Sequence, residues 1–165
     1  MNMNQAELHK IAQCLTAQRG DRSEVPDLKI RSVPYLREHW SGEFGQVGTE
    51  QISAFAASIE DLNPLHHDDE AAKKKRIMGT SLFGRIQTGV RLIGYASPTV
   101  VANFPDGMIV EIENMRFPRP LYAGSLPTVH CAIVKTSRKL TRVAIELKNG
   151  FETIVHGTCV IAHDG

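Results

Sequence analysis

The feature that most constrains the fold of this 165-residue chain is a change in hydrophobic periodicity near residue 107. Before it, residues 84–105 are apolar on nearly every side of a helix, which predicts a buried helix. After it, apolar and polar residues alternate, which predicts a meander of at least four strands up to residue 162. An antiparallel sheet has one apolar face that a single apolar helix can cover. The expected fold class is α+β, with a curved antiparallel sheet wrapped around a long central helix.

Turn and cap signals divide these elements. Asn149-Gly150 predicts a type I′ hairpin between the last two strands. The sequence Phe117-Pro118-Arg119-Pro120 separates the first strand from the second. Thr88 is the expected N-cap of the central helix, and Pro98 is expected to kink or end it. The glycine at position 84, inside this segment, indicates close approach of another chain segment or a helix terminus.

A shorter amphipathic helix is predicted over residues 50–60, with Thr49 as its N-cap. Pro64 disfavours a helical conformation at Asn63, so this helix should end before the proline. Residues 70–76, EAAKKKR, predict a short further helix. In all, the chain is expected to have an N-terminal helix and irregular arm at residues 1–40, with the apolar stripe of that helix at residues 5–18, and a main domain at residues 41–165.

Composition narrows the class of protein. The chain is 42% hydrophobic and 22% charged, as in an ordinary globular protein, and its net charge of +1 favours neither nucleic acid nor a membrane surface. No stretch reaches the roughly 18 apolar residues of a membrane span, and the polar start lacks the pattern of a signal peptide. The three scattered cysteines, Cys14, Cys131 and Cys159, predict reduced thiols and a cytoplasmic location.

The stretch DLNPLHHDD, residues 61–69, places two histidines and three acids around an Asn-Pro turn. Adjacent His66 and His67 lack the i, i+4 spacing of a helical metal pair, so a metal site is not expected. The simplest interpretation is a polar turn with solvated side chains, because Asp and Asn, which occupy positions 61 and 63, are common in turns. The alternative is an acid–base pair of Asp61 and His66, which the turn can bring to one side to act on one water.

Such chemistry also needs a place for developing negative charge. Backbone N–H groups at a helix N-terminus and the positive end of the helix dipole provide it. The central helix offers this near Thr88-Gly89, where glycine has no side chain to block an acyl oxygen. Together these groups suit the addition of water to a conjugated thioester, whose enolate oxygen the N–H groups would hold.

Three segments, IEDLNPLHHDDEAA, GRIQTGV and ENMRFPRPLYAGS, resemble the MaoC-like, or (R)-specific enoyl-CoA hydratase, family over about residues 42–162. The resemblance implies a hot-dog fold and reversible hydration of trans-2-enoyl-CoA to (R)-3-hydroxyacyl-CoA, with no metal or redox cofactor. It carries the catalytic pair onto Asp61 and His66 and the oxyanion-hole amide onto Gly89. Asn63 would hold the loop, and Ser97 falls where a family hydroxyl lies near the active centre. The family usually forms homodimers, with the acyl-CoA entering near the subunit interface.

Two departures from the family pattern concern the entrance to the site. The family commonly has His-Gly where this chain has Thr88-Gly89, and Thr88 would border the substrate while capping the helix. The segment between His66 and Gly89 is longer than usual around KKKRIMGTS. Its basic run, residues 73–76, is either a solvated face or a contact for the phosphates of CoA, and four charges without aromatic residues argue weakly for nucleic acid.

Two other functions stay open from sequence alone. A hot-dog thioesterase would cleave the same class of substrate, but residues 84–100 contain no acid on the central helix to support it. A non-catalytic acyl-CoA-binding module is the other alternative.

Overall fold

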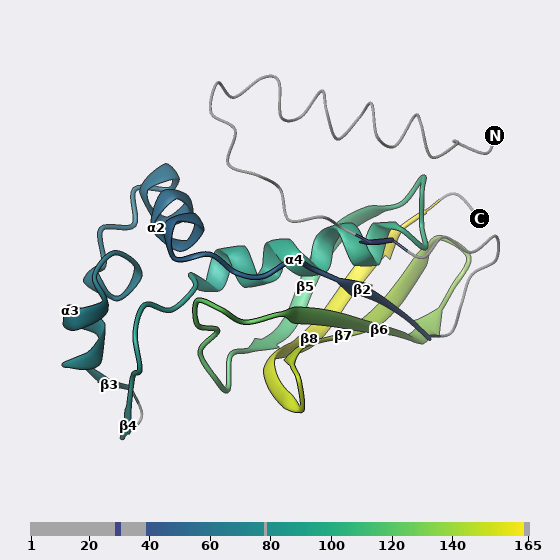
Figure 1. The fold of residues 1–165 in the computed structure, drawn as a ribbon. Helices are drawn as coiled ribbons and strands as arrows, with labels where there is room; N and C mark the ends of the chain where they lie inside the picture. The colour runs from purple at the N-terminus through teal and green to yellow at the C-terminus, as the bar shows by residue number, and fades with distance from the viewer. Residues whose placement is uncertain (1–28, 31–38, 78, 164–165) are drawn as a thin grey trace.

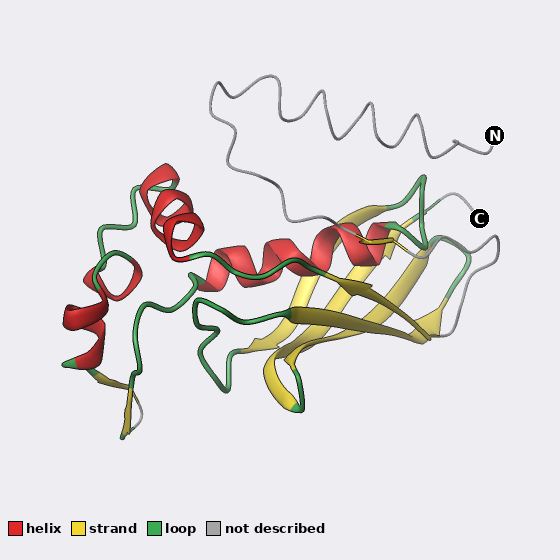
Figure 2. Cartoon of the chain, in the orientation of Figure 1, coloured by secondary structure: helices red, strands yellow, loops and turns green. Residues whose placement is uncertain are grey.

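The computed structural model describes residues 29–30, 39–77 and 79–163. The helix expected at residues 5–18 lies outside this part of the chain. The main sheet is antiparallel, with strand order β1-β2-β6-β7-β8-β5. Its strands are β1 (Lys29–Ile30), β2 (His39–Glu43), β5 (Met108–Arg116), β6 (Pro127–Thr136), β7 (Leu140–Asn149) and β8 (Glu152–Ala162). Figure 2 shows helix α4 (Gly89–Val101) lying along one face of this sheet, as predicted.

Helix α4 is shorter and less buried than the sequence predicts. It begins at Gly89, not at residue 84, because the preceding residues bond to other segments: Ile86 N–H donates to Leu65 O and Gln87 N–H donates to Leu121 O. Pro98 lies inside the helix, which continues for three more residues, so the proline does not end it. The side of α4 that faces the sheet is buried and contains Leu92, Tyr95, Ala96, Thr99 and Val100. The opposite side is exposed, as at Val90 and Ser97.

The sequence analysis expected an irregular arm within residues 1–40, but β1 and the first two residues of β2 belong to the main sheet. Strand β2 also contacts α4 directly. The Trp40 indole donates a hydrogen bond to Thr99 O at 2.6 Å, and Gly42 lies against the Thr99 side chain. A sheet partner and these two contacts therefore fix a strand that has little apolar pattern of its own.

The predicted hairpin between β7 and β8 is confirmed, but the predicted type I′ turn is wrong. Asn149 pairs with Glu152, so the two central residues are Gly150 and Phe151 rather than Asn149 and Gly150. Gly150 has a φ of +60°, whereas Phe151 is not among the residues with positive φ. A positive φ at the first central position alone is the pattern of a type II′ turn, which favours glycine there.

A second group of elements lies beyond the N-terminal end of α4 (Figure 1). It contains α2 (Thr49–Ser58), the 3₁₀ helix η1 (Pro64–His66), α3 (Asp69–Lys73), β3 (Arg76–Ile77) and β4 (Thr80–Ser81). The N-cap of α2 is Gly48 and not Thr49, because Gln51 accepts a hydrogen bond from the Gly48 amide. A small apolar cluster of Ala72, Leu82 and Ile86 joins α3 to the segment before α4. Within the described residues, no helix is long and apolar enough to cross a membrane.

Candidate active site

The C-terminal end of α2 sets the position of Asp61. The Asp61 N–H donates to Ala56 O at 2.9 Å and the Glu60 N–H donates to Ala57 O at 3.1 Å. With Glu60 at a φ of +58°, these are the two hydrogen bonds of a Schellman motif. The motif reverses the chain within one residue, so Asp61 leaves the helix end at a fixed angle.

The turn after Asp61 is held by side chains that bond to the backbone. Asp61 Oδ1 accepts from Asn63 N–H at 3.1 Å, and Asn63 Oδ1 accepts from Leu65 N–H at 3.1 Å. Asn63 has extended backbone and is the N-cap of η1, as expected of a residue before proline. The ring of His67 bonds through Nε2 to Asp61 O at 2.7 Å. Asn63 and His67 therefore hold the loop rather than stand free in solvent.

His66 is buried and faces Asp61. Its Nδ1 lies 2.7 Å from Ile86 O, and because a carbonyl can only accept, Nδ1 must be protonated. Its Nε2 lies 3.4 Å from Asp61 Oδ2, with the His66 side chain 10% exposed and that of Asp61 34% exposed. In neutral His66 both facing atoms are acceptors, so they bond directly only when a proton is added; otherwise a water that donates to both satisfies them. The geometry thus presents one basic nitrogen and one carboxylate to the same small space.

The start of α4 supplies a free amide just after the segment that bonds to His66. The Gly89 N–H is the first of the helix and has no acceptor among the described residues. Thr88 is buried, and its hydroxyl accepts from Arg91 N–H at 3.3 Å, which makes it the N-cap as predicted. Ile86, three residues before Gly89, is the acceptor for His66, so the segment that leads into α4 is tied to the Asp61–His66 turn. The ring of Phe117 lies where a Cβ built on Gly89 would meet it at ordinary contact distance.

Ser97 is not brought to the pair by any contact within the described chain. It is exposed on α4, eight residues after Gly89, or about 12 Å along the helix axis. The structure therefore groups Asp61, Asn63 and His66, ties His66 to Ile86 in the segment that leads to Gly89, and leaves Ser97 on the outward side of the helix. The Thr88 hydroxyl accepts from the Arg91 amide and so helps to fix the start of α4, and its contact with the substrate stays a prediction.

Several residues at the site carried no signal that sequence reasoning could use. Ser53, Asp69 and Arg85 form a hydrogen-bonded network behind His66, and they come from α2, α3 and the segment before α4. Each is an ordinary polar residue in its local sequence, and only the tertiary structure joins them. His67 could have been suspected from the His-His pair, but its acceptor is a backbone carbonyl, which sequence does not reveal.

The charged residues around the site do not form a metal centre within the part of the chain that the structure describes, where no group of three or more His, Cys, Asp or Glu could hold an ion. The basic run is exposed and only its first residue is helical, so α3 ends earlier than expected. Lys73 pairs with Glu70 at 2.7 Å and Arg76 donates to Gly79 O. Two of the four cations therefore stabilise the local helix and hairpin.

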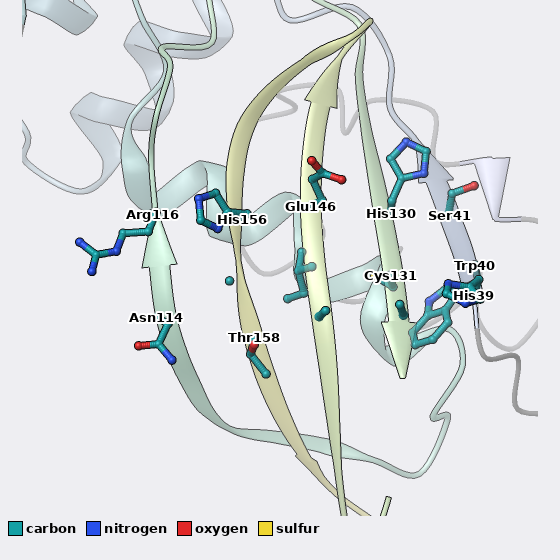
Figure 3. A pocket seen from close by; sticks show the side chains of 14 residues that line it. His39, Trp40, Ser41, Asn114, Arg116, His130, Cys131, Glu146, His156 and Thr158 are labelled. Carbon is teal, nitrogen blue, oxygen red and sulfur yellow. The ribbon is translucent and has the colours of Figure 1, made fainter. Parts of the chain in front are cut away.

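A hollow on the outer face of the sheet is separate from these residues (Figure 3). His130, Glu146 and His156 stand opposite one another on neighbouring strands and alternate with core residues, so they point away from α4. Glu146 accepts a hydrogen bond from Thr153 and pairs with Lys148, and these contacts lower the pKa of its carboxyl. This row belongs to the solvent-facing side of the sheet and does not reach the Asp61–His66 pair.

Comparison with known proteins identifies the family of this chain. The model of the MaoC-like domain family matches residues 34–153. The chain belongs to the MaoC-like domain family. A search of curated proteins found no match. The division at residue 41 stays a prediction, although the family match and β1 both begin before it.

Solved structures share the fold at low identity. A protein of Archaeoglobus fulgidus superposes with a TM-score of 0.69 at 18% identity, covering 96% of both chains. The (R)-hydratase PhaJ1 of Pseudomonas aeruginosa gives 0.62 at 20% identity, covering 86% of this chain and 83% of its own. The (R)-hydratase of A. caviae involved in PHA biosynthesis gives 0.62 at 20% identity, covering 87% and 99%. This MaoC-like chain therefore has the hot-dog fold that the resemblance implied.

Proposed function

We propose that this MaoC-like protein is a hydro-lyase that adds water reversibly to trans-2-enoyl-CoA to give (R)-3-hydroxyacyl-CoA. One observation carries the proposal: Asp61 and His66 face each other at 3.4 Å, and His66 bonds to the segment that leads into α4, whose first amide, at Gly89, has no acceptor in the described chain. Membership of the family supports it at the level of the class of enzyme.

The tautomer of His66 assigns the roles. In the hydration direction, a water held by Asp61 and by Nε2 of neutral His66 loses a proton to Nε2 as its oxygen bonds to C3 of the enoyl group. The C2–C3 π electrons move toward the thioester, and the Gly89 N–H stabilises the negative charge on its oxygen. The imidazolium then returns the proton to C2. The sum is addition of OH to C3 and H to C2, with His66 and Asp61 unchanged.

This sequence of steps balances without a metal or redox cofactor, and CoA enters only as part of the substrate. Asp61 contributes its negative charge, which favours the imidazolium formed midway, and it orients the water. The bond from Nδ1 to Ile86 O keeps the other nitrogen of His66 available for the proton. The amide of Gly89 approaches the acyl oxygen freely because the residue has no side chain.

We also propose that two copies associate along β5 and the exposed side of α4. Strand β5 is at the edge of the sheet, so its free backbone groups can pair with another strand. Exposed apolar side chains lie on both elements: Val90 is 60% exposed, Val110 50% and Ile112 44%. Light scattering coupled to gel filtration should give twice the mass of one chain; a monomer at micromolar concentration would contradict this association.

The activity is tested by following the loss of enoyl absorbance when the protein is added to crotonyl-CoA and longer enoyl-CoAs. We expect Asp61→Asn and His66→Gln each to lower kcat by roughly 10²- to 10⁴-fold, the usual contribution of a general acid or base. Both substitutions preserve side-chain volume, so far-ultraviolet circular dichroism and the melting temperature should stay close to those of the parent.

Matched controls come from outside the site. Asp106→Asn lies in the exposed turn after α4 and His156→Gln on the outer sheet face, and both should retain full activity. Full activity in both site variants would refute the roles of Asp61 and His66. Release of free CoA thiol without loss of the enoyl group would instead indicate a thioesterase, and substrate binding without turnover would indicate a binding module.

A further inference from the structure

Arg85 donates two hydrogen bonds to the carboxylate of Asp69, one from its backbone and one from its side chain. Its backbone N–H donates to Asp69 Oδ1 at 2.8 Å, and its Nη2 donates to Asp69 Oδ2 at 2.9 Å. One carboxylate therefore holds both the main chain and the side chain of the same residue. The hydrogen bond from the Arg85 guanidinium lowers the pKa of Asp69 to about 2, so the pair stays charged throughout the neutral range.

The second nitrogen of the same guanidinium reaches the backbone of His66 through a serine. Arg85 Nη1 donates to Ser53 Oγ at 3.0 Å, and Ser53 Oγ donates to His66 O at 2.8 Å. Since the guanidinium is only a donor, the serine proton has to point to His66 O. The direction of this relay is fixed, and it bridges α2, η1 and the segment before α4.

The residue after Arg85 closes the network. Ile86 O accepts from His66 Nδ1 at 2.7 Å, and Ile86 N–H donates to Leu65 O at 3.0 Å. Both the carbonyl of His66 and the acceptor of its ring are thereby tied to Arg85. A lysine at position 85 has one terminal nitrogen and no planar fork, so it cannot hold Ser53 and Asp69 in this geometry.

The glycine at position 84 fits the same network. A Cβ on Gly84 would lie 3.0 Å from Asp69 Oδ1, closer than side chains normally come. Glycine thus lets the carboxylate reach the Arg85 amide. The close approach of α3 to Gly84 is one of the two explanations that the sequence analysis gave for this glycine.

We propose that Arg85, held by Asp69 and linked through Ser53, is a positioning residue for His66: it fixes Ile86 O so that Nδ1 is always the protonated nitrogen and Nε2 is always the one presented beside Asp61. Arg85 does not touch the reacting atoms. The kinetic consequence of this inference rests on the proposed hydration, whereas its effect on the tautomer of His66 does not.

The tautomer is measured directly by two-bond ¹⁵N–¹H correlation of the histidine rings in the full-length protein, at a pH where His66 is neutral. The His66 signals are assigned by their loss in His66→Gln. We expect the parent and Arg142→Met to show the single Nδ1–H tautomer, and Arg85→Met to show a mixture. Arg142 is the matched control because it also binds a carboxylate through two nitrogens, with Glu113, on strands of the main sheet. A single Nδ1–H tautomer in Arg85→Met would overturn the proposal.

Kinetics gives the second measurement. We expect Arg85→Met to lower kcat roughly 10- to 100-fold with KM within about twofold, because displacement of a catalytic group slows the chemistry and leaves substrate contacts in place. Arg85→Lys should lie between Arg85→Met and the parent. An unchanged kcat in Arg85→Met would overturn the positioning role even if the tautomer changed.

Two outcomes keep this inference separate from the proposed function. If the parent has no hydratase activity, the proposed function fails, and the tautomer spectra alone decide the role of Arg85. If Arg85→Met does not fold, two other variants test the same network. Ser53→Ala removes the hydrogen bond to His66 O, and Gly84→Ala places a methyl group against Asp69 Oδ1 without deleting a polar group. A parent-like tautomer in both of these variants would also overturn the proposal.

Discussion

Glu60 occupies a backbone conformation that is unfavourable for its side chain, and this makes its replacement by glycine informative. Its φ of +58° places it in the left-handed region, at the position of the Schellman motif that glycine usually fills. The left-handed conformation costs an L-residue about 1–2 kcal/mol. Glycine avoids that cost but loses roughly 0.5–1 kcal/mol more backbone entropy on folding. The difference predicts that Glu60→Gly raises the free energy of unfolding by about 0.5–1 kcal/mol.

The assay is urea unfolding followed by circular dichroism, with calorimetry for the melting temperature. A gain of this size should raise the melting temperature by roughly 1–4 °C in a chain of this length. Glu60→Ala is the control, since it removes the carboxylate but keeps Cβ and should change stability by less than about 0.5 kcal/mol. Enoyl-CoA hydration should be unchanged in Glu60→Gly, because the Asp61 amide keeps its bond to Ala56 O. If glycine is no more stabilising than alanine, the left-handed conformation is not a source of strain and the reasoning fails.

Two further predictions concern the core. Gly42→Ala would place a methyl group against the Thr99 side chain and should destabilise the protein by about 1–3 kcal/mol, with partial recovery in the double variant with Thr99→Ala, measured by urea unfolding. Burial raises the pKa of Cys131 to about 12 and that of Cys159 to about 11, so folding favours the thiol forms. This contribution to stability is present below the unfolded-state thiol pKa near 9.0 and should be lost as pH rises through 11 to 12. Peptide mapping after alkylation at mildly alkaline pH should find both thiols protected in the native protein and labelled in urea.

The elements that sequence could predict are those whose pattern is local. The alternation in β7 and in the first half of β6 exposes one face and buries the other, and a two-residue period reports that directly. Thr88 was predicted as a cap because its hydroxyl bonds three residues along the chain. The hairpin between β7 and β8 was expected for the same reason, although Asn149 extends the strand pairing and moves the turn to the next residue.

The parts that sequence missed depend on partners far away in the chain. Residues 84–88 were included in the predicted helix, but the amides of Ile86 and Gln87 donate to Leu65 O and Leu121 O, and these bonds are incompatible with a helix. Strand β2 has no alternating apolar pattern, and its pairing with β6 and its contacts with Thr99 define it. A pattern search cannot identify bonds that exist only after distant segments meet.

The candidate site also has one part built by short-range contacts and one part that depends on distant residues. The Asp61–His66 half lies within six residues and is built by a helix C-cap, two side-chain-to-backbone bonds and a proline, all of which are short-range. The amide of Gly89 comes from 23 residues further on and is joined to His66 through Ile86 O. Substitutions in the turn should therefore alter how Asp61 lies relative to His66. Those in α3 or in the segment before α4 should alter the position of Ile86 O, and with it the tautomer of His66. The proposed hydration requires both halves, and the Arg85 network joins the turn, at His66 O, to the segment that leads into α4.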